Sequence, residues 1–244
     1  MEPLLIIGII VAAFVGVNIG GSSAGVSFGP ATGSDIISVR TACILMSFFA
    51  LLGGVVVGPR VVDTMGKGIV PGDSFTLAAS ITVLFFTGAS ILIGNLMNIS
   101  SSTSQIAVGA IIGMGIAAGN LDYAVIGRIF MWWLLSAVIA FWISAVIGRY
   151  LYDRTVEFLK NQTSEKIRAG LVILVGCYMA FSAGSSNVAN AIAPLVGSGS
   201  VQMIPAVLMA CAAIGVGVFT FGPRIMKAIG GDITDLPLEA SLLV

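Results

Sequence analysis

Three short polar segments interrupt an otherwise apolar sequence. They cover residues 20–30, 102–105 and 184–194, and they are rich in Ser, Thr, Asn and Gln with nearby Gly and Pro. Their side chains are neutral hydrogen-bond donors, and an interrupted helix adds free backbone N–H groups. Such donors suit a small oxyanion that is held without a buried cation. The candidate substrate-binding residues are Ser22, Ser23, Ser102, Thr103, Ser104, Ser186, Asn187 and Asn190.

A structural explanation competes with this one for each serine taken alone. A serine inside a helix can bond back to a carbonyl of the preceding turn or hold two helices together. Three such segments, two of them related by an internal repeat, favour a binding site over scattered packing residues.

Other kinds of chemistry are poorly supported. The sequence has no histidine, and Cys43, Cys177 and Cys211 stand singly in apolar stretches without metal-ligand spacing. No carboxylate pair or nucleophile–base pair falls within an apolar segment, so we expect neither an enzyme nor a bound cofactor or metal. The formal net charge is zero, which gives no support for a nucleic-acid partner.

The elements that carry the polar segments are predicted to be transmembrane helices. Hydrophobic residues make up 57% of the sequence, charged residues only 9%, and the mean hydropathy is +1.08, whereas a soluble domain has about 25% charged residues. A helical span needs about 20 apolar residues. Candidate spans are residues 4–20, 36–58, 75–97, 105–119, 123–147, 170–190 and 203–222. The fourth is short and rich in glycine, so it could be half of a re-entrant hairpin.

The residues between 149 and 168 form a charged linker with five Lys or Arg residues, which predicts a cytoplasmic position in a multi-pass cell-membrane protein. The linker also suggests a division into three parts. These are a first transmembrane repeat with the Ser/Thr segment at 1–148, the linker at 149–169, and a second, shorter repeat at 170–244.

An offset of 164 residues aligns the two halves without a gap. Pro30 aligns with Pro194, and the Gly-Pro-Arg of residues 58–60 aligns with that of 222–224. Secondary transporters often consist of inverted repeats with the binding site between them. We therefore predict an all-α integral membrane protein, a polytopic helix bundle with two inverted repeats and broken or re-entrant helices.

At these segments the sequence resembles the inorganic phosphate transporter (PiT) family of phosphate and sulfate permeases. The family signature, Gly-Ala-Asn-Asp-x-Ala-Asn-Ala, resembles residues 184–191 closely and residues 20–27 more distantly. The family's Pro-x-Ser-Thr-Thr-His element resembles residues 100–105. The resemblance implies a secondary transporter that carries phosphate or sulfate across the lipid bilayer, by symport with an ion.

The sequence departs from the family pattern at the acidic positions. The signature aspartate falls on Ser23 and Asn187, and the histidine falls on Gln105. Without these carboxylates a proton is a better candidate coupling ion than sodium. A serine-rich first motif looks more like the sulfate-permease branch, and fully ionised sulfate needs only donors.

A second copy of the Ser/Thr segment does not follow the second repeat. We therefore keep three explanations open: a fragment, a site completed by another chain, or a protein that does not transport alone. A passive anion channel and a non-transporting subunit of a larger membrane complex are the alternatives to a permease, and a homo-oligomer is a further option.

Overall fold

In a computed structural model, residues 3–70, 76–97, 99, 101–151 and 165–231 are described. Nearly all of them are helical. The first half comprises α1 (Pro3–Gly33), α2 (Val39–Val56), α3 (Gly58–Asp63), the π-helical turn η1 (Thr64–Gly68), α4 (Leu77–Leu96), α5 (Thr103–Ala118), α6 (Tyr123–Val146) and the π-helical turn η2 (Ile147–Leu151). The second half comprises α8 (Glu165–Gly197), α9 (Met203–Thr220) and α10 (Gly222–Gly231).

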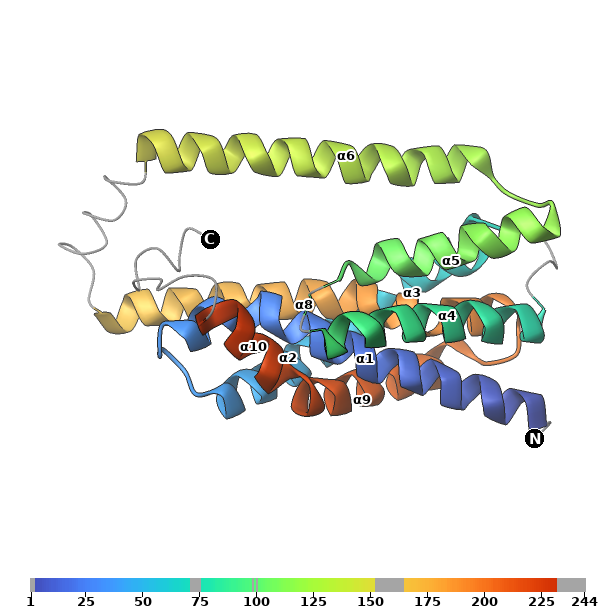
Figure 1. The fold of residues 1–244 in the computed structure, drawn as a ribbon, viewed down its shortest axis with the longest axis horizontal. Helices are drawn as coiled ribbons and strands as arrows, with labels where there is room; N and C mark the ends of the chain where they lie inside the picture. Colours follow the sequence, from blue (N-terminus) through green and yellow to red (C-terminus); the bar gives the residue numbers. More distant parts are fainter. Residues whose placement is uncertain (1–2, 71–75, 98, 100, 152–164, 232–244) are drawn as a thin grey trace.

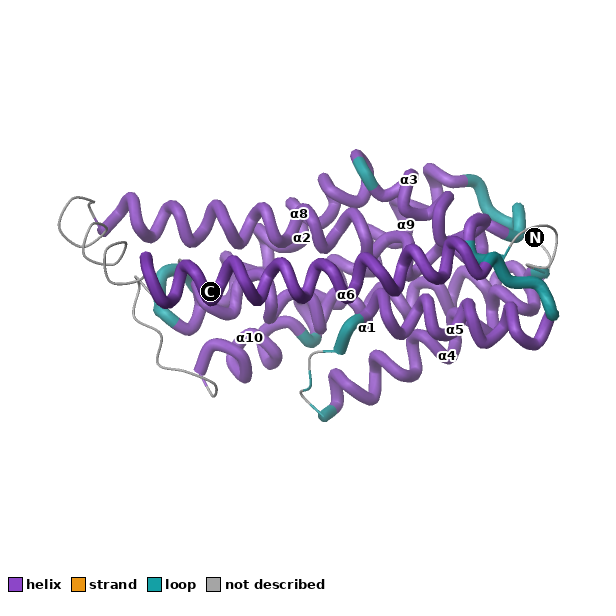
Figure 2. Tube along the Cα trace, turned by 90° about the horizontal axis from the view of Figure 1, so that it is seen from above, coloured by secondary structure: helices purple, strands orange, loops and turns teal. Residues whose placement is uncertain are grey.

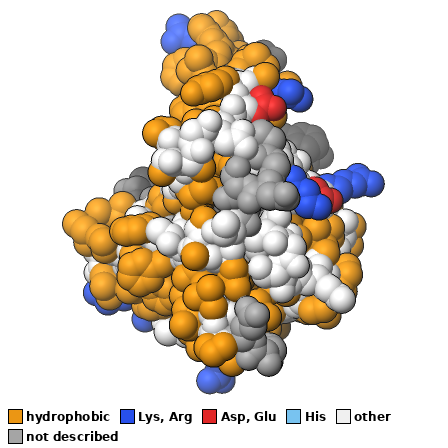
Figure 3. All heavy atoms as spheres, turned by 90° about the vertical axis from the view of Figure 1, so that its right-hand side faces the viewer, with side chains coloured by type: hydrophobic (Ala, Val, Ile, Leu, Met, Phe, Trp, Pro, Cys, Tyr) orange, Lys and Arg blue, Asp and Glu red, His pale blue; other side chains and the backbone are white. Residues whose placement is uncertain are grey.

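Six helices in the described residues are long and apolar enough to cross a membrane. They lie along one common axis, as Figure 1 shows. Seen from the end that holds the N-terminus, hydrophobic side chains cover the flanks of the molecule and charged ones are few (Figure 3). This distribution fits a protein whose flanks face lipid, and it confirms the predicted all-α membrane bundle.

The short glycine-rich span is half of a re-entrant hairpin. α4 and α5 enter the bundle from the same end, and the turn between them lies near the middle of the long axis rather than at its far end (Figure 1). The helices pack against each other and against α1 and α8. The prediction of a re-entrant helix is therefore confirmed for this hairpin.

The polar segments of α1 and α8 do not break their helices. α1 is continuous for 31 residues and α8 for 33, and each contains its proline (Pro30, Pro194) near the C-terminal end. The serine hydroxyls are accommodated within the helix, where the Ser22 hydroxyl donates to the Ile19 carbonyl. The polar segments thus lie on long continuous helices. Helix ends at mid-depth are found at the hairpin and at the two Gly-Pro-Arg breaks, α2–α3 and α9–α10, where Gly58 lies beside Val188 and Gly222 beside Ala24.

The two repeats are inverted and interlocked. α1 and α8 run in opposite directions (Figure 1). α1 packs against α9 and α10 of the second repeat, while α8 packs against α2 and α3 of the first. A Cβ at Gly20 would overlap the carbonyl oxygen of Ile214, and a Cβ at Gly184 would overlap that of Ala50. Gly184 is the repeat equivalent of Gly20, and Ile214 is the repeat equivalent of Ala50. The two repeats therefore make the same close contact with each other twice.

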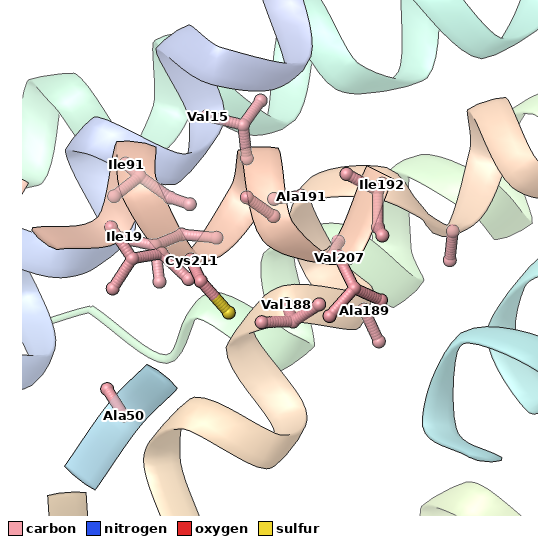
Figure 4. Packing of buried hydrophobic residues seen from close by; sticks show 14 of the residues in the cluster. Val15, Ile19, Ala50, Ile91, Val188, Ala189, Ala191, Ile192, Val207 and Cys211 are labelled. Atoms are coloured by element: carbon pink, nitrogen blue, oxygen red, sulfur yellow. The ribbon is translucent and has the colours of Figure 1, made fainter. Parts of the chain in front are cut away.

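The interlocked helices enclose a core of aliphatic side chains. Val188, Ala191 and Ile192 of α8 lie close to Val15 and Ile19 of α1 (Figure 4). This layer of small and branched residues lets the helices approach closely, as is usual for membrane helices. It holds α1 and α8 beside each other at the level of their polar segments.

α6 lies along one side of the bundle (Figures 1 and 2). None of its residues is buried. Only its N-terminal half contacts the core, through Val125, Ile126, Ile129 and Trp133. Its remaining length presents apolar side chains outward.

Candidate functional site

The two polar segments meet at the centre of the bundle. Asn187 of α8 is buried, and its Nδ2 donates a hydrogen bond of 2.8 Å to the Ser23 hydroxyl of α1. Ser23 and Asn187 are the two positions at which the signature aspartates would fall. Here they form a neutral pair that joins the two repeats.

The tip of the re-entrant hairpin reaches the same place. The Thr103 hydroxyl at the start of α5 donates to Asn187 Oδ1 at 3.0 Å. Asn190, one helical turn after Asn187, donates to the Thr103 hydroxyl at 3.3 Å and to the Ser104 hydroxyl at 3.2 Å. Three helices from distant parts of the sequence are therefore joined by one hydrogen-bonded network.

The N-terminus of α5 adds backbone donors to this network. The first bond within the helix runs from the Ile106 N–H to the Ser102 carbonyl, so the N–H groups of residues 103–105 have no acceptor inside the helix. The Ser102 side chain does not cap them. A helix N-terminus with free N–H groups carries partial positive charge and favours an anion.

A cavity of about 270 Å³ lies beside these groups. Seven of the eight candidate binding residues line it, and the eighth, Asn190, lies directly behind Thr103 and Ser104. None of the described residues that line the cavity is charged. The cavity extends toward the end of the molecule where α1 ends and α8 begins, because the further lining residues of these helices lie closer to that end than Ser23 and Asn187 do. They are Val26 and Ser27 of α1 and Met179, Ser182 and Ala183 of α8.

The hydroxyl groups of the cavity differ in whether they already donate a hydrogen bond within the protein. Ser22 and Ser186 donate to the carbonyls of Ile19 and Ala183, which are repeat equivalents of each other. The hydroxyls of Ser23 and Ser104 each accept a hydrogen bond from an asparagine, and neither donates to a described residue. Ser23 and Ser104 are thus side-chain donors available to a ligand, as are the other lining serines Ser27, Ser101, Ser102 and Ser182, whose hydroxyls donate to no described residue.

Sequence reasoning missed several residues of the cavity. They are Val26, Ser27, Ser101, Met179, Ser182 and Ala183. Ser182 could have been found, because it lies one helical turn before Ser186 on the same face of α8. The apolar members carry no signal that distinguishes them from packing residues. Of the predicted linker, residues 152–164 lie outside the described residues, as does residue 100 of the Ser/Thr segment.

A sequence profile of the Phosphate transporter family matches residues 19–159 and 152–242. The chain belongs to this family. The sulfate permease CysP of Bacillus subtilis (strain 168) is 32% identical over 227 residues, which cover 93% of this chain and 64% of that protein. A putative phosphate permease of Chlamydia pneumoniae is 24% identical over 344 residues, covering 97% of this chain and 80% of the relative.

A relative whose name states sodium dependence also matches. The sodium-dependent phosphate transporter 1-A of Xenopus laevis is 26% identical over 230 residues, which cover 89% of this chain and 33% of that protein. The chain thus spans less than two thirds of the length of the Bacillus and Xenopus relatives. A solved structure of a sodium-dependent phosphate transporter superposes with a TM-score of 0.84 at 22% identity, covering 98% of this chain and 81% of the other. This similarity confirms the fold.

Proposed function

We propose that this chain forms the substrate path of a permease for a tetrahedral oxyanion, and that sulfate is the preferred substrate over phosphate. The observation that carries the proposal is the convergence of the α5 N-terminus with the Ser23 and Ser104 hydroxyls on one uncharged cavity. These groups offer donors to an anion without a formal positive charge. The identity with a sulfate permease supports the same class of substrate.

The chemistry of the donors favours sulfate. Fully ionised sulfate only accepts hydrogen bonds, whereas phosphate near neutral pH carries an O–H that needs an acceptor. Near the site, the buried Asn190 Oδ1 has no hydrogen-bond partner among the described residues. Asn190 does not line the cavity, however. Apart from the oxygens of the lining hydroxyls, the described residues of the cavity therefore offer no unpartnered side-chain acceptor for a phosphate O–H.

We further propose that a proton gradient, and not a sodium gradient, drives uptake. Among the described residues that line the cavity there is no carboxylate to bind sodium. The linker with its five basic residues would lie in the cytoplasm of a cell-membrane protein. The cavity would then open toward the cytoplasm in this conformation, because α1 ends and α8 begins at the linker end.

Radiolabelled sulfate and phosphate test this proposal in two measurements. Equilibrium binding to the full chain in lipid nanodiscs reports the site, and uptake into proteoliposomes with a proton or sodium gradient reports transport. We expect saturable sulfate binding, weaker phosphate binding, and uptake that responds to the proton gradient alone. Absence of binding by either anion to folded protein would overturn the assignment of the cavity, and stimulation by sodium would overturn the proposed coupling.

A further inference from the structure

A groove of about 360 Å³ lies between η1 and the N-terminal half of α6. Thr64 and Gly68 of η1 form one wall, and the other consists of Val125, Arg128, Ile129, Trp132 and Trp133 of α6. The Asp122 N–H at the start of α6 donates to the Ile69 carbonyl at 3.0 Å, and this bond fixes the two walls to each other at one end. No residue lines both this groove and the polar cavity, so the two are separate sites.

Arg128 has no counter-ion in the part of the chain that the structure describes. It is the one charged residue among the described residues that line the groove, and its guanidinium makes no ion pair or hydrogen bond with any of them. The carboxylate of Asp122 caps the N-terminus of α6 instead, and the Thr64 hydroxyl donates to the Arg60 carbonyl. A cation in a membrane span needs a partner, so the surroundings of the protein must supply one to Arg128.

The position of Arg128 along α6 places it at the level of lipid headgroups. The apolar segment Tyr123–Tyr150 has 28 residues and is about 42 Å long, since a helix rises about 1.5 Å per residue. The hydrocarbon core of a bilayer is about 30 Å thick, so about 6 Å at each end of a centred segment lies among the headgroups. Arg128 is about 7.5 Å from the start of α6. Its long side chain can therefore reach the phosphate layer.

The walls beyond Arg128 suit an acyl chain. Ile129, Trp132 and Trp133 follow within about one and a half helical turns, in the direction of the membrane centre. Trp133 packs edge-on against Phe130, with ring centroids 5.1 Å apart, whereas Trp132 is 56% exposed. Tryptophan favours the membrane interface, where its ring contacts lipid chains and its N–H contacts polar groups. The groove thus has a charged outer end and an apolar inner end, as a phospholipid has.

We propose that an anionic phospholipid occupies this groove, with its phosphate at the Arg128 guanidinium and one acyl chain against Trp132 and Trp133. It would lie in the leaflet where α6 begins, at the end of the molecule opposite the linker (Figure 1). The described lining residues carry one positive charge and no carboxylate, so a headgroup with a net negative charge complements them better than a zwitterionic one. A free anion would leave the apolar walls uncovered.

The bound lipid would attach α6 to the bundle. None of the residues of α6 is buried, and only its N-terminal half contacts the core. A lipid in the groove would contact η1 and α6 together and would add apolar contacts where the protein makes few of its own. The inference rests on the fold and the groove, and it does not require the proposed substrate.

The tryptophans of the groove provide a direct probe. The sequence has three tryptophans, all on α6, and Trp142 is the one that does not line the groove. The variant Trp142→Phe therefore restricts the fluorescence to the groove. Brominated acyl chains quench tryptophan on contact. Quenching by brominated phosphatidylglycerol, compared with brominated phosphatidylcholine, then measures the preference of the groove for an anionic lipid.

The full chain with Trp142→Phe is reconstituted into phosphatidylcholine bilayers that contain an increasing fraction of either brominated lipid. We expect phosphatidylglycerol to be preferred about fivefold, which is the effect of one basic residue on an anionic lipid. The preference should disappear when Arg128→Gln is added. Lys67→Gln is the matched control, since it removes an exposed cation of η1 that does not line the groove, and it should keep the fivefold preference.

Inorganic phosphate added to the buffer separates a lipid from a free anion, and it should not relieve the quenching by phosphatidylglycerol. Relief by inorganic phosphate would assign Arg128 to a free anion and overturn the proposal. Equal quenching by the two lipids in the Trp142→Phe chain would show that the groove does not select its lipid. A preference that survives Arg128→Gln, or one that is lost in Lys67→Gln, would also overturn the assignment.

Discussion

Asn187 donates its 2.8 Å hydrogen bond to Ser23, and these two residues are equivalent positions of the inverted repeat, 164 residues apart. A contact between a residue and its own repeat equivalent lies on the axis that relates the two halves. The axis therefore passes through the candidate site. Because both positions lie on the axis, two aspartates there would be held close together. The neutral Ser23 and Asn187 need no counter-ion at the same place.

A carboxylate on this axis should impair anion binding. We predict that Asn187→Asp raises the half-saturation concentration for sulfate at least about tenfold at neutral pH, since like charges at about 4 Å repel by on the order of 1–4 kcal/mol. Protonation of the new carboxylate removes the repulsion, so sulfate binding should recover as the pH is lowered. The neutral variant Asn187→Ser should show no such recovery. Equilibrium sulfate binding in nanodiscs, measured across a pH series without a proton gradient, separates the two, and equal pH profiles would contradict the prediction.

Thr103 connects the hairpin to both asparagines, and its hydroxyl is needed for both bonds. Thr103→Val should leave Asn187 Oδ1 without its donor at a cost of about 1–3 kcal/mol, and sulfate affinity should fall about tenfold. Thr103→Ser restores the hydroxyl and should retain nearly normal affinity. Equilibrium binding in nanodiscs measures both variants. An unchanged affinity in the valine variant would show that the hairpin tip does not organise the site.

Asn190 is buried and holds Thr103 and Ser104 in place. Asn190→Ala should abolish saturable uptake, because the N-terminus of α5 loses its anchor on α8, while the protein still inserts into the membrane. Asn95→Ala is a matched control, since Asn95 is also buried and bonded but makes no bond to the cavity-lining residues Thr103 and Ser104. The control should lose stability by a similar amount and keep sulfate binding. If both variants lose binding equally, Asn190 has only a structural role.

The close approach of the repeats depends on glycine. Gly184→Ala places a methyl group on the backbone of Ala50, and overpacking of this kind costs about 1–3 kcal/mol or more. Gly113→Ala adds the same methyl group where nothing lies within 4 Å. Thermal unfolding in detergent should show a clear loss of stability for the first variant and none for the second. A stable Gly184→Ala protein would mean that the helices can separate at little cost.

The parts of the fold that depend on local sequence patterns could be predicted. Apolar run lengths predicted the spans, and the 164-residue offset predicted the inverted repeats. The interlocking could not be predicted, because nothing in α1 alone indicates that its glycines face α9 rather than α2. The sequence also did not indicate that α1 and α8 are continuous helices. Gly and Pro residues permit a break, and only the packing around Pro30 and Pro194 determines that the helices continue.

For the candidate site, the sequence supplied the polar side chains but not their partners. The eight candidate residues do converge, since all three polar segments reach one cavity. The pairing of Ser23 with Asn187 follows from the antiparallel placement of α1 and α8, which hydropathy does not report. Met179 and Val26 could not be found, because an apolar residue in a membrane span carries no sign of its neighbour. Their position became visible only in the folded structure, where both residues line the cavity.

The interlocked glycines also constrain how the protein is made. Gly20 is translated long before Ile214, the residue whose backbone it must touch. At about 5–20 residues per second, the ribosome needs on the order of 10–40 s to synthesise the intervening chain. During that time α1 and α2 lie in the bilayer without the second-repeat helices α8, α9 and α10, although α1 can already pack against α4. Completion of the bundle is therefore a late event that follows the insertion of α9, and a ribosome stalled after α6 would leave the surfaces of α1 and α2 that contact the second repeat uncovered.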